Sequence, residues 1–76
     1  MGSELPVIRV REVLLAIGKA GYTVLPGRGK GSHIALLSAD GVRLLIVPNH
    51  GEIKRGTLRA LIRQAGMTVE EFRALL

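Results

Sequence analysis

The sequence contains no cysteine and no tryptophan, and Tyr22 and Phe72 are its only aromatic residues. The lack of cysteine excludes disulfides and thiolate metal sites, and it favours the reducing cytoplasm as the setting. No apolar run approaches the roughly 18 residues of a membrane span. The N-terminus also lacks the basic region followed by an apolar one that marks a signal peptide. The sequence therefore predicts a cytoplasmic protein without a membrane partner, whose core is built mainly from leucine, isoleucine and valine.

The length of 76 residues leaves room for a single small domain. Residues 1–3, Met-Gly-Ser, are typical of an expression remnant. We therefore expect an N-terminal tail over residues 1–8 and one domain over residues 9–76.

The net charge of +5 is distributed unevenly along the chain. Between Arg28 and Arg63 lie seven cations, opposed only by Asp40 and Glu52, so this window carries the whole excess. A one-sided basic surface raises the local concentration of polyanions, which predicts that the protein binds one. The alternative is a solvated surface that keeps a small hydrophobic protein soluble.

The pattern of apolar residues predicts a helix, three strands and two further helices. Apolar residues at i, i+3, i+4 and i+7 place the first helix over residues 9–20, and Gly21 is typical of its C-terminal cap. Residues 22–26, 32–38 and 42–48 are expected to be strands, with Gly41 in the turn of the second hairpin. Residues 49–56 are expected to form a polar loop.

The second helix ends at Gly66 and begins either by Arg55 or after a cap at residues 56–57. Thr68 and Glu71 form a capping box that opens a short last helix. This order predicts an α+β fold, with a three-stranded antiparallel sheet and the helices on one of its faces. Both faces of the hairpin over 32–48 are apolar, so the face without helices is expected to meet a partner or a second copy. Alternatively, it is a curled sheet with some exposed aliphatic side chains.

The segment GRGKGSH, residues 27–33, joins glycines and cations to one of only two histidines. Glycines allow a backbone to approach phosphate oxygens closely, and an imidazole exchanges protons near neutral pH. The segment is therefore a candidate site for a phosphodiester, with these residues: Arg28, Gly29, Lys30, Gly31, Ser32 and His33. The alternative is a structural histidine at a strand end. The segment is no Walker motif, because no helix follows it, and a Ser32–His33 dyad is disfavoured because neighbours on a strand point to opposite faces.

A second basic cluster comprises Lys54, Arg55, Arg59 and Arg63. The three arginines are spaced four residues apart and form one stripe if the helix begins by Arg55. They are either further phosphate contacts or an ordinary solvated helix face. A metal site is not expected, because a catalytic zinc normally takes three protein ligands, whereas His33 and His50 are the only histidines and cysteine is absent.

Three stretches of the chain resemble the HicA toxin family, the YcfA-like mRNA interferases of bacterial toxin–antitoxin systems. They are REVLLAIGKAGY (11–22), GKGSHIAL (29–36) and DGVRLLIVPNHGEIKRGTLRALIRQAGMTVEEF (40–72). The resemblance covers nearly the whole chain. It implies a double-stranded-RNA-binding-like α-β-β-β-α fold, cleavage of mRNA, a HicB-type antitoxin as protein partner, and a catalytic histidine at His33.

On this interpretation the protein is a metal-independent endoribonuclease without cofactors. His33 would act on the 2′-hydroxyl or on the leaving 5′-oxygen, while Lys30, Arg28 and Lys54 would hold the phosphate. We expect little base selectivity, because the basic window contains no aromatic residue for stacking. Two alternatives remain open: a non-catalytic RNA-binding module of the same fold, and a protein-interaction domain for which RNA is incidental.

Overall fold

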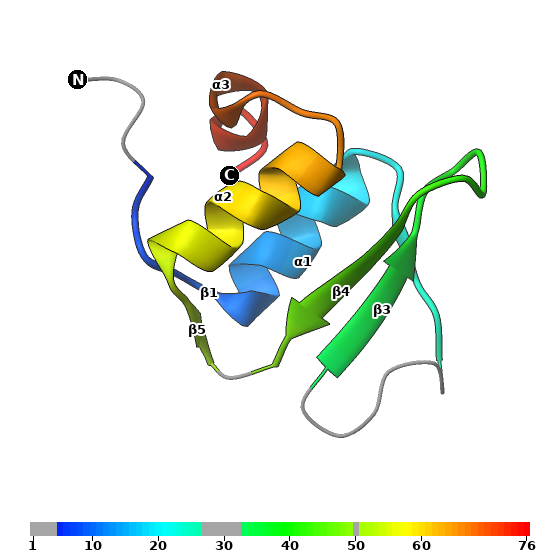
Figure 1. The fold of residues 1–76 in the computed structure, drawn as a ribbon, viewed down its shortest axis with the longest axis horizontal. Coiled ribbons are helices and arrows are strands. Elements are labelled where there is room, and N and C mark those ends of the chain that lie inside the picture. Colours follow the sequence, from blue (N-terminus) through cyan, green and yellow to red (C-terminus); the bar gives the residue numbers. More distant parts are fainter. Residues whose placement is uncertain (1–4, 27–32, 50) are drawn as a thin grey trace.

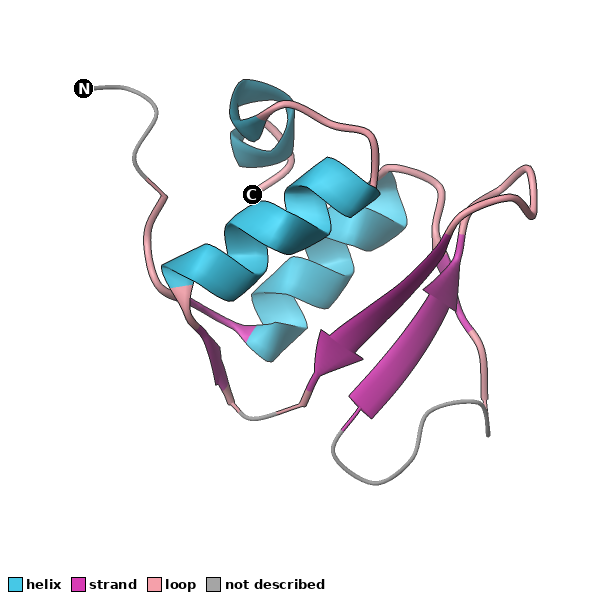
Figure 2. Ribbon diagram, viewed as in Figure 1, coloured by secondary structure: helices cyan, strands magenta, loops and turns pink. Residues whose placement is uncertain are grey.

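The computed structural model of the chain describes residues 5–26, 33–49 and 51–76. Two layers are visible in Figure 1, with α1 and α2 side by side on one face of the β3–β4 hairpin and α3 above them. The elements, coloured by type in Figure 2, follow one another as β1 (Ile8–Arg9), α1 (Val10–Lys19), β2 (Thr23–Val24), β3 (His33–Leu37), β4 (Leu44–Pro48), β5 (Glu52–Ile53), α2 (Arg55–Gln64) and α3 (Val69–Arg73). The α+β fold with a three-stranded sheet and a short last helix is confirmed, and it is consistent with the double-stranded-RNA-binding-like architecture.

The main sheet has the order β2-β3-β4 and is antiparallel throughout. Its longest pairing joins β3 to β4, in a register that sets His33 opposite Pro48 and Leu37 opposite Leu44. The turn between these strands contains Gly41 at φ +76°, as the sequence predicted. This register determines which side chains share a face of the sheet.

The core lies between the helices and the sheet and is mostly aliphatic. Helix α1 buries Val13, Ala16 and Ile17 on one side, as expected of its apolar stripe. Helix α2 buries Leu58, Leu61 and Ile62, and β3 and β4 contribute Leu36, Leu45 and Val47. The largest fully buried side chain is Phe72 of α3. The last helix is therefore part of the core and not an appendage.

Helices α2 and α3 begin after the N-cap residues Lys54 and Thr68. Helix α2 starts at Arg55 with Lys54 as its N-cap residue, so the earlier of the two predicted starts is confirmed. Before α3, the Thr68 backbone N–H donates to Glu71 Oε1 (2.8 Å) and Glu71 N–H donates to Thr68 Oγ1 (3.0 Å). This reciprocal pair is the predicted capping box, and it satisfies two backbone donors that a helix start otherwise leaves open.

The segment before α1 differs from the tail expected over residues 1–8. Leu5 and Ile8 are buried in the core, and β1 pairs antiparallel with β5 inside the expected polar loop. The backbone N–H of Val10 also donates to the carbonyl of Gly51 (2.8 Å). Strands of two residues have no periodicity to read, which is why the sequence did not reveal this second small sheet.

The two apolar faces of the β3–β4 hairpin differ in burial. Leu45 and Val47 are fully buried beneath the helices, whereas Leu44 and Ile46, on the opposite face, are each about 45% exposed. Val42, before β4, is more exposed still. The expected apolar surface on the face without helices is therefore present.

Candidate functional site

His33 is the first residue of β3 and is exposed to solvent. Ile34 and Leu36 on the same strand pack into or against the core. Because side chains alternate along a strand, His33 belongs to the opposite face, with Leu37. The imidazole therefore lies at one end of the sheet face that carries Leu44 and Ile46, accessible from outside.

The predicted phosphate-binding loop directly precedes this histidine in the sequence. Arg28, Gly29, Lys30, Gly31 and Ser32 lie outside the described residues, as does His50. The chain connection alone places Ser32 next to His33. Their proposed contacts with a phosphate remain predictions from the sequence.

Lys54 is the described member of the second basic cluster that shares a surface with the His33 strand end. It lines a groove of about 470 Å³. We call this the β5 groove, and its lining residues are Val7, Pro48, Glu52, Ile53, Lys54 and Thr57. Pro48 is the direct cross-strand neighbour of His33, and side chains in that relationship have Cβ atoms about 4.5–5.5 Å apart. Pro48 thus links the β5 groove, which Lys54 lines, to the strand end of His33.

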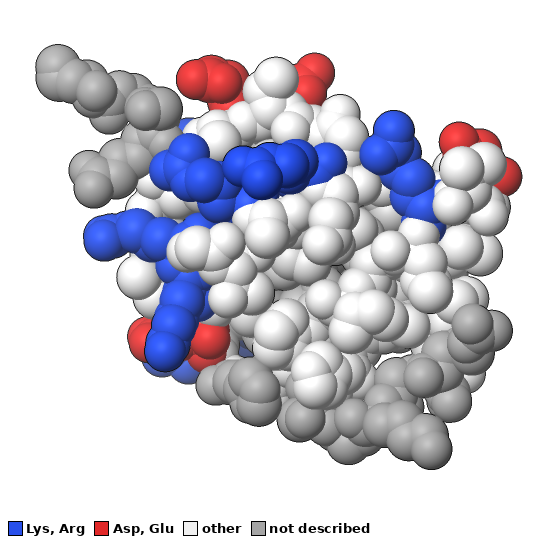
Figure 3. Space-filling view, viewed as in Figure 1, with Lys and Arg blue, Asp and Glu red and all other residues white. Residues whose placement is uncertain are grey.

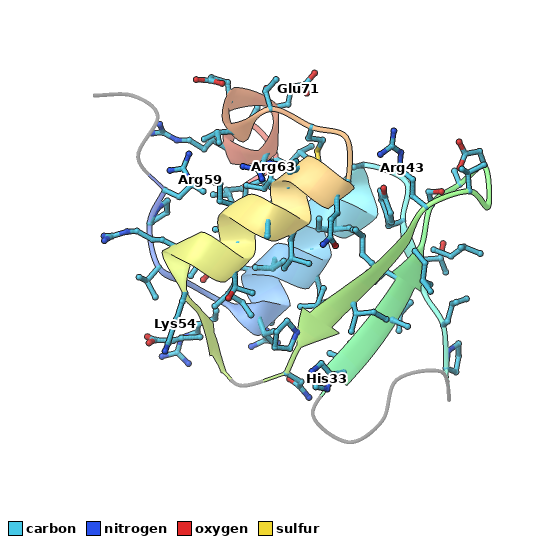
Figure 4. All side chains as sticks on the ribbon, in the orientation of Figure 1. His33, Arg43, Lys54, Arg59, Arg63 and Glu71 are labelled. Carbon is cyan, nitrogen blue, oxygen red and sulfur yellow. The ribbon has the colours of Figure 1, made fainter. Side chains whose placement is uncertain are left out.

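The arginines of α2 lie elsewhere. Arg59 and Arg63 line a separate hollow between α2 and α3, with Met67 and Val69 among its other walls. In Figure 4 both are on the far side of α2 from His33, whereas Lys54 and His33 are in the lower half of the view. Figure 3 shows blue surface over α2 and at its start, a separate blue patch beside the hairpin tip, and a white surface over the hairpin. The stripe predicted by the i, i+4 spacing exists, but it does not adjoin His33.

Arg55 has a partner within the fold. Its Nε donates to the backbone carbonyl of Leu5 at 2.6 Å. This contact ties the start of α2 to the N-terminal segment that enters the core. The Nε–H donor of Arg55 is therefore used within the fold and is not available to a phosphate.

The charges at the hairpin tip are also engaged locally. Asp40 Oδ1 accepts from Ser38 Oγ and from the backbone N–H of Val42. These hydrogen bonds, in that order, together with the charge of Arg43, hold the pKa of Asp40 below its ordinary value of 3.8. Arg43 Nη1 in turn donates to the Gln64 carbonyl at the end of α2 (3.1 Å). These contacts order the hairpin tip and connect it to the end of α2.

The described residues 5–26, 33–49 and 51–76 contain no cluster of three or more histidine and acidic side chains able to hold a metal ion. None of the helices in these segments is both long and apolar enough to cross a membrane.

Of the residues that line the β5 groove, only Lys54 was among the sequence candidates. Pro48 was interpreted only as the end of a strand, and Glu52 only as one of two charges opposing the cations. The pairing of His33 with Pro48 would have identified the neighbourhood, but a register is fixed by strand pairing, which one sequence does not specify to the residue.

Comparison with known families gives one match. Residues 10–67 match the family model described as the HicA toxin of bacterial toxin–antitoxin systems, which is most of the 76-residue chain. The search of curated proteins returned no match. The matched segment contains α1, both main hairpin strands and α2, and it includes His33.

Proposed function

The chain belongs to the HicA toxin family of bacterial toxin–antitoxin systems, and from this premise we propose that it is an endoribonuclease that cleaves mRNA. The observation that supports this activity most directly is the exposed imidazole of His33 at the end of a sheet face without helices. A catalytic group must reach the proton that it transfers. A histidine buried among aliphatic side chains would have argued against the proposal.

The proposed reaction uses the RNA's own 2′-hydroxyl as nucleophile. The 2′-oxygen bonds to phosphorus, the bond from phosphorus to the 5′-oxygen breaks, and the products are a 2′,3′-cyclic phosphate and a 5′-hydroxyl. His33 either accepts the 2′-hydroxyl proton, with water protonating the 5′-oxygen, or protonates the 5′-oxygen while water takes the first proton. General acid–base catalysis of this kind typically contributes about 10²–10⁴-fold, so positioning of the link must supply the rest.

Cations on both sides of His33 are proposed to hold the phosphate. Lys30 and Arg28 precede it in the sequence, and Lys54 lines the β5 groove together with Pro48, the cross-strand neighbour of His33. Positive charge close to the link would stabilise the charge that develops on the phosphate oxygens. Arg59, and any donors of Arg55 that remain available, are proposed to contact more distant phosphates of the strand.

A HicB-type antitoxin is proposed as the protein partner. The exposed apolar face that includes Val42, Leu44 and Ile46 supports this, because soluble monomers seldom leave contiguous apolar surface without a use. An antitoxin seated on that face would approach His33, which shares it.

The chemistry is tested with oligonucleotides that differ only at the link to be cut. A strand with one ribonucleotide among deoxyribonucleotides should be cut there and carry a cyclic phosphate, and the all-deoxy strand should stay intact. Cleavage of both strands would exclude the 2′-hydroxyl mechanism. Binding of RNA with no cleavage of either would instead indicate a non-catalytic RNA-binding module.

A further inference from the structure

The β5 groove has features that phosphate binding alone does not explain. Its volume of about 470 Å³ falls within the range of about 300–1,000 Å³ typical of small-molecule sites. Its apolar surface comes from Pro48 and Val7, since Ile53 is almost fully buried, and its lining also includes a cation, Lys54, and a carboxylate, Glu52. The apolar wall fits a flat apolar ligand, the cation fits an anionic group on it, and the carboxylate fits a hydrogen-bond donor on it.

Glu52 is the unexpected member of this set. Only two carboxylates occur in the basic window between Arg28 and Arg63, and Asp40 is bound to Ser38 and Val42 at the hairpin tip. Glu52 is exposed. Its backbone pairs with Arg9 across β1 and β5, but its carboxylate makes no hydrogen bond or ion pair with the residues that the structure describes. Within the part of the chain that the structure describes, no fold-stabilising contact accounts for the carboxylate.

A carboxylate beside a phosphate-binding site repels the substrate unless it meets a hydrogen-bond donor on it. RNA offers donors on the edges of its bases, and carboxylate side chains recognise amino-bearing bases by accepting from them. Lys54 lies two residues from Glu52 on the same rim, where it can neutralise the phosphate attached to such a nucleotide. The apolar wall then supplies a surface for the face of the base, in place of the aromatic platform that the chain lacks.

Guanine fits this arrangement best. Its N1–H and N2–H₂ groups point the same way and donate two parallel hydrogen bonds to one carboxylate, whereas the corresponding edge of uracil has carbonyl oxygens on both sides of a single N–H. Adenine and cytosine present an amino group beside an unprotonated ring nitrogen, which would repel the second carboxylate oxygen. The carboxylate therefore ranks the four bases with guanine first and uracil last.

We propose that the β5 groove binds the nucleobase adjacent to the cleaved link, and that Glu52 makes the protein select guanine there. The inference rests on the proposed ribonuclease activity. It relates the groove to the reacting group through Pro48, which lines the groove and is the cross-strand neighbour of His33. It replaces the expectation of low base selectivity with a preference at a single position. Lys54 holds the adjoining phosphate and contributes affinity for every sequence equally.

The test uses oligonucleotides with one ribonucleotide, so that cleavage is confined to one link, and with the base on either side of that link varied in turn. The bases are guanine, adenine, cytosine, uracil and inosine, which keeps N1–H but lacks the N2 amino group. Wild type is compared with Glu52→Gln and with Glu70→Gln, which removes the same charge from an exposed position on α3. Binding to the corresponding all-deoxy strands is measured in parallel by fluorescence anisotropy, with deoxyuridine and deoxyinosine as the uracil and inosine members.

We expect wild type to prefer guanine to uracil by about 5- to 150-fold in kcat/KM at one of the two positions, the range of a good bidentate base contact. Replacing guanine by inosine in the substrate should remove most of that preference, because inosine lacks the N2 amino group that donates to the carboxylate. Glu52→Gln should reduce the preference to less than about threefold, while Glu70→Gln retains it.

Two results would overturn the inference while leaving the ribonuclease intact: equal cleavage of all bases by wild type, or an unchanged guanine preference in Glu52→Gln. If wild type cleaves none of the oligonucleotides, the proposed ribonuclease function fails. The anisotropy measurements on the all-deoxy strands then test by themselves whether the β5 groove binds a base. A guanine preference in binding that depends on Glu52 would then support the groove as a base site, and its absence would reject it.

Discussion

The guanidinium of Arg43 occupies the space where a side chain at Gly66 would lie. A Cβ atom built on Gly66 would be 2.9 Å from Arg43 Cζ, closer than such atoms approach in real structures, and Gly66 has φ +77°. Arg43 spans this point to reach the Gln64 carbonyl at the end of α2. The hairpin and α2 are thus joined at a position where a side chain would have to displace the guanidinium and adopt a backbone conformation that favours glycine.

Gly66→Ala should therefore destabilise the protein by more than Gly41→Ala. Both residues have positive φ, which costs a non-glycine residue about 1–2 kcal/mol, but a Cβ at Gly41 meets nothing within 4 Å. The alanine at position 66 must also displace Arg43 and its hydrogen bond, at a further cost of about 0.5–1.5 kcal/mol. Urea unfolding of the two variants measures the difference, and equal losses would show that Arg43 contributes nothing there.

Phe72→Ala should cost about 3–5 kcal/mol, the usual loss for a buried phenylalanine, because the ring is fully buried. That is a large part of the total stability of a small domain, which is about 0.05–0.15 kcal/mol per residue. The control is Leu15→Ala, at a leucine that is 65% exposed, which should change stability by less than about 0.5 kcal/mol. Thermal unfolding followed by circular dichroism compares them. A small effect of Phe72→Ala would mean that α3, beyond the matched residues 10–67, does not hold the core together.

The hairpin tip should make stability depend on pH in acid. The pKa of Asp40 is lowered in the folded protein, first by Ser38, then by Val42 and by the charge of Arg43. A lowered folded pKa means that the unfolded chain binds the proton more readily, so the stabilisation is complete above the ordinary value of 3.8 and is lost as pH falls through the folded value. Melting temperatures between pH 6 and pH 2 should fall less steeply for Asp40→Asn than for wild type. If the melting temperatures of the two proteins fell in parallel with pH, the lowered pKa of Asp40 would not contribute to the acid dependence of stability.

Lys54→Ala should weaken RNA binding and cleavage for all sequences alike. The residue is proposed to hold one phosphate, and each phosphate contact on a single strand contributes about 0.7 to the slope of log K against log salt. We expect that slope to become shallower by about this amount, measured by anisotropy between 50 and 200 mM salt. Arg11→Ala, which removes the same charge from an exposed position on α1, should leave the slope unchanged. If both variants behave alike, Lys54 contributes only to the overall charge.

The helices and the main strands could be predicted from the sequence, because their signals are local. Three examples are the apolar stripe of α1, the turn at Gly41 and the capping box of Thr68 and Glu71. Each depends on residues only a few positions apart. The pairing of β1 with β5 was missed because it joins segments far apart in the chain, each only two residues long.

The candidate site was predictable in its parts but not in its arrangement. His33 stood out because histidine is rare in the chain and follows glycines and cations. Lys54 and Glu52 line a groove with Pro48, the cross-strand neighbour of His33, whereas Arg59 lines another hollow. This arrangement depends on the register of β3 with β4 and on the direction in which α2 leaves β5. These are tertiary relationships, and the spacing of charges along one helix contains no information about them.

The central claim, that His33 performs the chemistry on RNA, is tested most directly by incubating a labelled mRNA in EDTA with wild type and with His33→Ala, after confirming that both are folded. Cleavage by wild type and none above background by the variant is the predicted result. Equal cleavage by the two proteins would contradict it.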